Sequence, residues 1–289
     1  EDEGFWEESY PDGASLPELV LNGDYEELGS NLITDGDFPT GTSAWSLQDG
    51  NISLSIVGGE GKVTMVGGST YIFQTFNTTP GKVYEGSFDF RAGDNVSTGQ
   101  VQLRSGSDLG SSMSSFFTQG SRASDNSGRS VQVTNGTGTF MFTADNSTTT
   151  IRLINEKTTT PANAFWDNII VKEVDPNDRW SLGTGWSIFD GKAVFSGTDF
   201  ANLQLSSAIL NIGDTYELTL TAAVTNGSFK VQHSGSSDLI TESSSGTYSV
   251  TFTATATSFT IARATVGSQN DFTIDNVTVR EYAIQPQDV

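Results

Sequence analysis

The chain has no cysteine among its 289 residues and only one histidine, His233. A disulfide bond, a thiolate metal site and a cysteine nucleophile are therefore excluded. Neither a GxSxG elbow nor an HExxH motif is present, and no glycine loop typical of phosphate binding occurs. A lone histidine without these motifs gives catalysis little support, and we expect His233 on the surface of a sheet. The sequence thus predicts a protein that is not an enzyme.

Positive charge is also scarce, with 14 Lys and Arg against 35 Asp and Glu and a net charge of −21. A nucleic-acid partner is disfavoured because such proteins present a basic face. No apolar run approaches the roughly 20 residues of a membrane span. No signal peptide is visible, and because the chain does not begin with Met we expect a processed start or a longer chain.

The acidic residues are concentrated at the start of the chain. Residues 1–30 contain ten acids and neither Lys nor Arg. Such a segment predicts an acidic arm or linker. Either it is a solvated terminus, or it docks a partner through the apolar side chains of Phe5, Trp6 and Tyr10.

Helical periodicity is missing as well, whereas alternation with period two is frequent. Residues 84–90 (YEGSFDF) and 216–224 (YELTLTAAV) place apolar side chains on one face and mostly polar ones on the other. This pattern is typical of antiparallel strands with one packed face and one wet face. Turn dipeptides such as Asp49-Gly50 and Asn226-Gly227 separate the expected strands.

Most of the chain is present twice. Residues 61–74 (GKVTMVGGSTYIFQ) match 191–204 (GKAVFSGTDFANLQ), and the copies close on 165–174 (FWDNIIVKEV) and 272–282 (FTIDNVTVREY). Many short strands in two copies predict an all-β chain. We expect two tandem antiparallel β-sandwich domains of the jelly-roll type, preceded by the acidic N-terminal arm.

The repeats set the expected boundaries. The arm covers residues 1–30, the first jelly roll 31–174, the second 175–282, and a C-terminal tail 283–289. The copies are offset by 130 residues at Gln74 and Gln204 but by 110 at Ile151 and Ile261. The first copy therefore contains an insertion at about 110–134, which is either a functional loop or a tolerated surface excursion.

A shorter repeat lies at the start of the chain. Residues 18–26 (ELVLNGDYE) resemble 31–38 (NLITDGDF), which form the expected first strand of the first copy. The second copy lacks this opening and begins almost at Trp180. This shorter repeat is therefore either the remnant of another module or a strand that pairs with a neighbouring chain.

The NLITDGDF opening, the phrases AWS (44–46) and GWS (185–187), and the closing D-N-[IV]-x-V-[KR]-E together resemble a known group of domains. They are similar to the galactose-binding-like jelly rolls of carbohydrate-binding module families 4, 9 and 22. Residues 172–193 (KEVDPNDRWSLGTGWSIFDGKA) more particularly resemble tandem modules in virion structural proteins of tailed bacteriophages. The resemblance covers about 19–282 and implies the fold more strongly than the function, because such modules occur in many kinds of protein.

Two sets of candidate site residues follow. Aromatic and amide side chains at repeated positions could stack on a sugar ring or bind its hydroxyls; the alternatives are a core plug for the tryptophans and surface pairs for the glutamines. The glycan-binding candidates are Trp45, Gln74, Gln102, Arg104, Trp186, Gln204 and Gln232. The resemblance also implies a structural calcium ion, held by acids of the first and last strands. Its candidates are Asp37, Asp167 and Asp275; the alternative is that Asp167 and Asp275 cap a turn.

We therefore expect a non-enzymatic virion surface protein of a tailed phage: a capsid decoration, head fibre or tail component. Its partners would be other virion proteins, bound through the arm, and glycans of a host or its surroundings. A homo-oligomer is also compatible with the sequence. The alternatives are a glycan-binding module of a secreted or cell-surface protein, and an accessory module of a polysaccharide-degrading enzyme.

Overall fold

Alternating burial along the longest strands determines the architecture. In β5 (Val83–Ala92) and β16 (Thr215–Asn226), every second residue along most of the strand is buried while its neighbours are more exposed. The computed structural model describes residues 16–39, 41–68, 70–113, 115–119, 130–199, 201–233, 238–265 and 267–282, with the backbone alone for 115–119. Every helix or strand assigned in these residues is a β-strand. The all-β prediction is confirmed.

The chain divides into two compact units, which we name module A and module B. Module A is Leu28–Pro176, and module B combines Glu1–Glu27 with Asn177–Val289. Module A is thus inserted into the sequence of module B. This division differs from the expected boundaries, because residues 16–27 belong to module B rather than to a separate arm. Phe5, Trp6, Tyr10 and the predicted tail lie outside the described residues.

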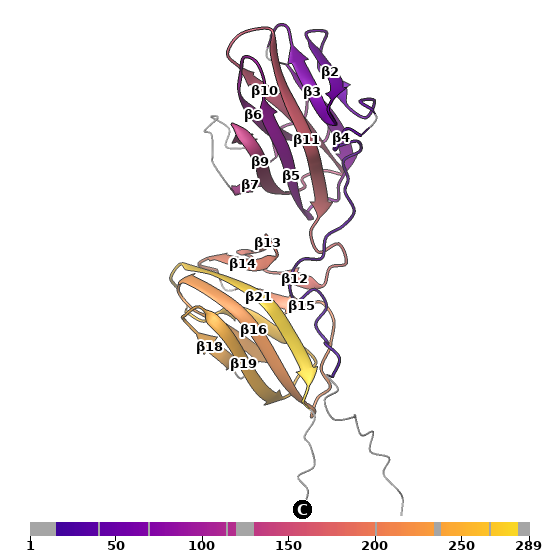
Figure 1. Ribbon diagram of the computed structural model, residues 1–289. Helices are drawn as coiled ribbons and strands as arrows, with labels where there is room; N and C mark the ends of the chain where they lie inside the picture. Colours follow the sequence, from indigo (N-terminus) through magenta and orange to yellow (C-terminus); the bar gives the residue numbers. More distant parts are fainter. Residues whose placement is uncertain are drawn as a thin grey trace, which may run out of the picture. The chain divides into compact units, whose positions relative to one another are not determined.

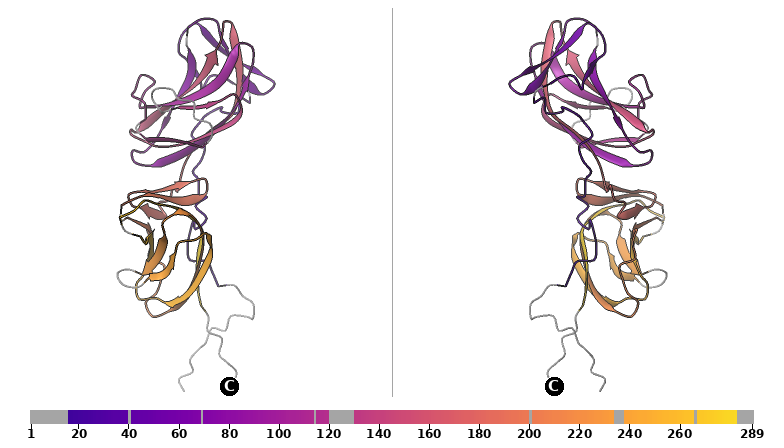
Figure 2. Two further views of the ribbon diagram at one scale, coloured as in Figure 1. Left: turned by 90° about the vertical axis from the view of Figure 1, so that its left-hand side faces the viewer. Right: turned by 90° about the vertical axis from the view of Figure 1, so that its right-hand side faces the viewer.

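Module A is a sandwich of two antiparallel sheets (Figures 1 and 2). One sheet has the order β1-β4-β10-β6-β8 and the other β2-β3-β11-β5-β9-β7. The remaining strands are β1 (Ser46–Leu47), β2 (Ile52–Val57), β3 (Glu60–Met65), β4 (Tyr71–Asn77), β6 (Val96–Ser105), β7 (Ser115–Gln119), β8 (Ser130–Val133), β9 (Asn135–Thr143), β10 (Thr148–Lys157) and β11 (Ala162–Glu173). The core between the sheets includes Phe88, Phe140 and Trp166, all fully buried.

Module B repeats this sandwich with the sheet orders β12-β15-β20-β17-β18 and β13-β14-β21-β16-β19. Its strands besides β16 are β12 (Trp180–Leu182), β13 (Trp186–Phe189), β14 (Lys192–Gly197), β15 (Asn202–Leu205), β17 (Phe229–His233), β18 (Asp238–Glu242), β19 (Gly246–Thr253), β20 (Phe259–Arg263) and β21 (Asn270–Glu281). The matching orders confirm the predicted pair of β-sandwich domains.

The insertion expected at about 110–134 contributes strands. Within it, β7 pairs with β9 and becomes the sixth strand of one sheet, whereas the corresponding sheet of module B has five. β8 pairs with β6 at the edge of the other sheet, in the position that β18 occupies in module B. The described part of the insertion therefore extends the sandwich, and residues 120–129 lie outside the description.

The repeated Asp-Asn motif forms a β-bulge in the last strand of each module, β11 and β21. The register of β11 shifts between Asp167 and Ile170, and Asn168 has a φ of 49°. The equivalent Asn276 in β21 has a φ of 51°, and asparagine tolerates this left-handed region better than most residues. Each aspartate accepts a hydrogen bond from the next backbone N–H, at 2.8 Å for Asp167 and 2.7 Å for Asp275.

In module A the bulge binds the opening segment. The N–H of Ile169, which follows the bulge asparagine, donates to the carbonyl oxygen of Gly36 at 3.0 Å, and Leu32 N–H donates to Val171 O at 2.8 Å. A Cβ atom on Gly36 would lie 2.1 Å from the oxygen of Ile169. Only glycine fits this approach of two backbones.

Module B has the same arrangement, and its opening segment is residues 16–27. The N–H of Val277 donates to Gly23 O at 2.8 Å, and Leu19 N–H donates to Val279 O at 2.9 Å. A Cβ on Gly23 would lie 2.0 Å from Val277 O. The expectation that the second copy lacks an opening is therefore wrong. Its opening precedes module A in sequence and runs along β21 (Figure 1).

Candidate functional site

The two candidate tryptophans are core residues. Trp45 is 5% exposed and Trp186 is 7% exposed. The indole Nε1 of Trp45 donates to Asp35 O at 3.1 Å, and that of Trp186 donates to Ala201 O at 3.0 Å. A ring that packs into a core cannot present its face to a sugar, so we remove Trp45 and Trp186 from the glycan-binding set.

The repeat also pairs these tryptophans differently from the sequence prediction. The structural equivalent of Trp45 is Trp180, whose Nε1 donates to Asn22 O at 2.8 Å. Both indoles bind the carbonyl of the residue before the opening glycine, and each ring packs on the opening aromatic, at 5.8 Å for Phe38 and 5.0 Å for Tyr25. The signal in the sequence is the phrase WSL, which occurs at 45–47 and again at 180–182.

Gln74 and Gln204 are not equivalent either. Gln74 points inward, and its amide binds the backbone of the opening segment at Thr34 N and O and at Ala44 O. Gln204 is exposed. The strand register aligns Gln204 with Phe73, because Ser46 pairs with Phe73 as Ser181 pairs with Gln204. A slip of one residue in the alignment reverses the face of every side chain in a strand. Gln74 therefore has a structural role and leaves the site.

The outer face of the sheet β1-β4-β10-β6-β8 brings the strongest functional candidates together. Phe73, Arg152 and Gln102 lie side by side on β4, β10 and β6. Tyr71 lies two residues before Phe73 on the same face, with the two rings 6.1 Å apart. Tyr71 and Arg152 are themselves largely covered. The more accessible side chains of the face are therefore Phe73, Gln102 and Arg104. We call the whole group the aromatic–arginine face. It consists of Tyr71, Phe73, Gln102, Arg104, Asp108 and Arg152.

Asp108 organises this face through hydrogen bonds. It accepts from the hydroxyl of Tyr71 at 3.0 Å and from Nε of Arg152 at 2.7 Å, and its backbone oxygen accepts from Nη2 of Arg152. The guanidinium carbon of Arg152 lies 4.1 Å from the centre of the Tyr71 ring. Burial raises the pKa of Tyr71, and the bond to Asp108 adds to this. Leu109, the next residue, is 88% exposed.

The predicted residues Gln102 and Arg104 extend the network. Oε1 of Gln102 accepts hydrogen bonds from Nη1 of Arg152 at 3.1 Å and from Nε and Nη2 of Arg104 at 3.2 and 2.8 Å. Nη1 of Arg104 donates to Ser112 at 2.9 Å. Four members of the site were not identified from the sequence: Tyr71, Phe73, Asp108 and Arg152. For Tyr71 and Phe73 a signal was present, because the alternation of residues 71–77 places both on the outward face of the strand.

Module B carries a different face at the same positions. Asn202, Gln204 and Thr260 replace Tyr71, Phe73 and Arg152 by strand register. Gln232 corresponds to Gln102, and its amide donates to Asp238. Nζ of Lys230 lies 3.4 Å from the same Asp238 carboxylate. The predicted residues Gln204 and Gln232 thus lie on a polar face that has neither an aromatic ring nor an arginine at the positions named.

His233 is buried rather than on the sheet surface. It follows Phe229 and Val231 on the inward face of β17, because all three positions are buried and alternate with half-buried ones. Its Nδ1 lies 3.2 Å from Oγ1 of Thr255, and its ring centre lies 4.6 Å from that of Phe252. Burial lowers the pKa of His233. The prediction of a surface histidine is wrong, and its buried position offers no access to a substrate.

The acids proposed for calcium are distributed over both modules. The pKa of Asp167 is raised by burial, with further contributions from Glu60, Asp89 and Asp37, so these carboxylates lie close enough to interact. The described residues nevertheless contain no group of three or more acid or histidine side chains that could hold a metal ion. Asp167 and Asp275 both cap the bulge, as the alternative expected. Carboxylate ligands from Asp37 and Asp167 alone do not form a calcium cage, and calcium binding there stays a prediction.

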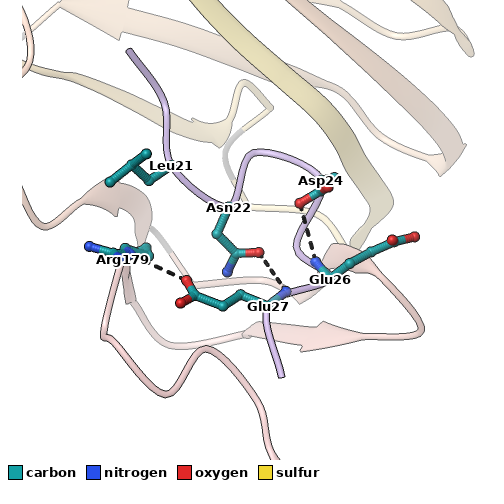
Figure 3. A pocket seen from close by; sticks show the side chains of 6 residues that line it. All are labelled: Leu21, Asn22, Asp24, Glu26, Glu27 and Arg179. Atoms are coloured by element: carbon teal, nitrogen blue, oxygen red, sulfur yellow. Dashed lines mark hydrogen bonds and ion pairs between the residues drawn. The ribbon is translucent and has the colours of Figure 1, made fainter. Parts of the chain in front are cut away.

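A shallow pocket of about 410 Å³ lies beside the opening segment of module B (Figure 3). Its lining consists of Leu21, Asn22, Asp24, Glu26, Glu27 and Arg179. The polar groups mostly hold the segment in shape. Oδ1 of Asn22 accepts from Glu27 N–H at 2.8 Å, and Oε2 of Glu27 lies 3.2 Å from Nε of Arg179. The residues that line the pocket therefore have a structural role, because they fix the turn of the opening segment.

No family model matches the chain, and no curated protein matches it. Similar solved structures include an N-terminal CBM22 tandem domain from Paenibacillus barcinonensis, with 11% identity, a TM-score of 0.37, and coverage of 89% of this chain and 100% of that one. A CBM4 structure has 19% identity, a TM-score of 0.32, and coverage of 53% and 99%. A truncated protein with CBM32 and alginate lyase domains has 9% identity, a TM-score of 0.23, and coverage of 82% and 99%. Likenesses this distant carry no conclusion about binding. The described residues contain no helix long and apolar enough to cross a membrane.

Proposed function

We propose that this chain is a non-enzymatic glycan-binding protein whose ligand lies on the aromatic–arginine face of module A. The observation that carries the proposal is the row of Phe73, Arg152 and Gln102 across three adjacent strands. An aromatic ring can contact the C–H groups of a sugar, while amide and guanidinium groups can bind its hydroxyls.

The hydrogen bonds within the face support this assignment. Asp108 ties Tyr71 and Arg152 together, and Gln102 connects Arg152 to Arg104. Side chains that are already fixed lose little freedom when a ligand binds, and this lowers the cost of association. Module B lacks the ring and the arginine at the corresponding positions, so we assign binding to module A.

The setting on a phage virion stays a separate prediction. Its expected docking residues, Phe5, Trp6 and Tyr10, lie outside the described residues. Residues 16–27 bury Val20 and Tyr25 within module B, so this part of the acidic segment is not free to dock a virion protein through those two side chains. The alternatives, a secreted glycan-binding module and an accessory module of an enzyme, would bind glycans through the same face.

A glycan array followed by calorimetric titration of the strongest neutral hit tests the proposal. Phe73→Ala is expected to weaken binding at least about tenfold, or about 1.4 kcal/mol. The matched control is Gln204→Ala, which changes the equivalent position in module B and should leave the affinity unchanged. Absence of any glycan hit, or equal losses in both variants, contradicts the proposal.

A further inference from the structure

Residues 16–27 cover a surface of module B that is made by residues of 177–282, and we call this covered surface the groove. The whole of module A separates this segment from the rest of module B in sequence. We propose that the groove is a strand-acceptor site that also takes residues 16–27 from a second copy of this chain. Copies would then associate by exchanging their opening segments.

Backbone hydrogen bonds supply the first part of the recognition. Val277 N–H donates to Gly23 O at 2.8 Å, and Leu19 N–H donates to Val279 O at 2.9 Å. The N–H of Val279 donates to the carboxylate of Glu18 at 2.8 Å. The segment therefore adds beside Val277 and Val279, beyond the stretch of β21 that pairs with β14. Extended peptides bind the unpaired edge of a strand in the same way.

Side chains supply specificity. Tyr25 is 1% exposed and packs on Trp180 with ring centres 5.0 Å apart. The indole of Trp180 binds the Asn22 carbonyl, and the site of Gly23 has no room for a Cβ atom. The groove thus selects a glycine and, two residues later, an aromatic ring, whereas the bond to Asn22 is made to the backbone. In module A, Gly36 and Phe38 make the equivalent contacts, and Trp45 binds the Asp35 carbonyl, so the same recognition occurs twice in this chain.

A second copy fits the groove because every contact just named is made by residues of 177–282. These residues are identical in every copy, and an exchanged segment would therefore recover the same hydrogen bonds and packing, as in domain swapping. The net charge of −21 opposes unspecific association between copies. Segment exchange offers a specific contact that can overcome this repulsion.

The first test uses the full chain carrying Gly23→Val, which prevents its own segment from seating. Hydrogen exchange of β21 should become faster, whereas β11 in module A serves as the internal reference and should not change. A synthetic peptide of residues 16–27 is expected to slow exchange in β21 at least about tenfold. The same peptide with Gly23→Val is the matched control and should have no effect. The Tyr25→Ala chain is a second chain whose own segment binds less well. If the wild-type peptide slows exchange in β21 neither in the Gly23→Val chain nor in the Tyr25→Ala chain, the proposal is overturned.

The second test distinguishes a peptide site from exchange between copies. The Gly23→Val chain retains its acceptor groove, whereas a full chain carrying Trp180→Ala retains a normal opening segment but has an impaired groove. Mixing the two should give a one-to-one heterodimer by light scattering, with protection of β21 recovered in the Gly23→Val chain. If the mixture stays monomeric and β21 stays unprotected, copies do not exchange segments and that part of the proposal is wrong.

Discussion

The indole N–H of Trp180 donates a hydrogen bond of 2.8 Å to the carbonyl oxygen of Asn22, 158 positions earlier in the chain. This bond fixes the opening segment of module B, and Trp45 makes the equivalent bond to Asp35 in module A. A jelly roll of this chain is therefore completed by a short segment that lies beside its closing strand, whatever the segment's position in sequence.

Trp180→Phe is expected to destabilise module B. The substitution keeps most of the ring contact with Tyr25 but removes the indole donor and leaves the Asn22 carbonyl with the Tyr25 N–H alone, at 3.2 Å. Loss of one such hydrogen bond costs about 0.5–1.5 kcal/mol. Urea unfolding, with hydrogen exchange of β21 to assign the module, measures the loss. Trp45→Phe is the matched variant and should destabilise module A instead. Equal effects of both variants on β21 would contradict the assignment.

Asp108→Ala is expected to destabilise module A, because it leaves the nearly buried guanidinium of Arg152 without its charged partner. Hydrogen bonds to charged groups contribute about 1.5–3 kcal/mol. The repeated acid in module B is the control, because Asp238 and its partner Lys230 form a more exposed ion pair. Asp238→Ala should cost no more than about 1 kcal/mol. Chemical denaturation of both variants makes the comparison, and equal losses would show that Asp108 has no special role.

His233 is expected to make module B less stable in mild acid. Burial lowers the pKa of His233, so the unfolded chain binds a proton at a higher pH than the folded chain does. Stability is therefore complete above the unfolded pKa of about 6.5 and falls as the pH drops below it. Thermal unfolding between about pH 5 and pH 8 measures this slope. His233→Phe should flatten it, and an unchanged slope would exclude His233 as its cause.

Asp167→Asn is expected to stabilise module A at neutral pH. Burial and the neighbouring carboxylates raise the pKa of Asp167, so ionisation costs the folded state more than the unfolded one. The penalty is absent at low pH and grows as the pH rises through the titration of Asp167. Asparagine keeps an acceptor for the Asn168 N–H. The gain should disappear near pH 3, where the aspartate itself is mostly protonated, and thermal unfolding at both pH values makes the comparison.

The same variant tests the predicted calcium ion. If calcium binds at Asp37 and Asp167, millimolar calcium raises the melting temperature of the wild-type chain relative to chelator. Asp167→Asn should remove this response. Asp275→Asn changes the third candidate, at the equivalent bulge of module B, and a reduced response in this variant would place calcium in module B as well. A wild-type melting temperature that does not depend on calcium contradicts the prediction.

Some of the candidate site could be predicted from the sequence. Gln102 and Arg104 lie two residues apart, and period two places both on one face of a strand. The partners Phe73 and Arg152 could not be identified in this way, because they come from other strands: Phe73 precedes Gln102 by 29 residues and Arg152 follows it by 50. The alignment of Gln74 with Gln204 failed for a related reason. Sequence similarity tolerates a slip of one residue, whereas a strand does not, since neighbouring side chains point to opposite faces.

By itself, the sequence determined the all-β fold, the duplication and the place of the insertion, because alternation and repetition are local patterns that survive in the order of residues. The tertiary structure decided which segment opens module B. The similarity of residues 18–26 to 31–38 showed two similar opening segments but not which strand each of them binds. Each opening binds the N–H group that follows a bulge asparagine, Ile169 for Gly36 and Val277 for Gly23, where there is room only for a glycine. This binding site exists only once β11 and β21 have folded.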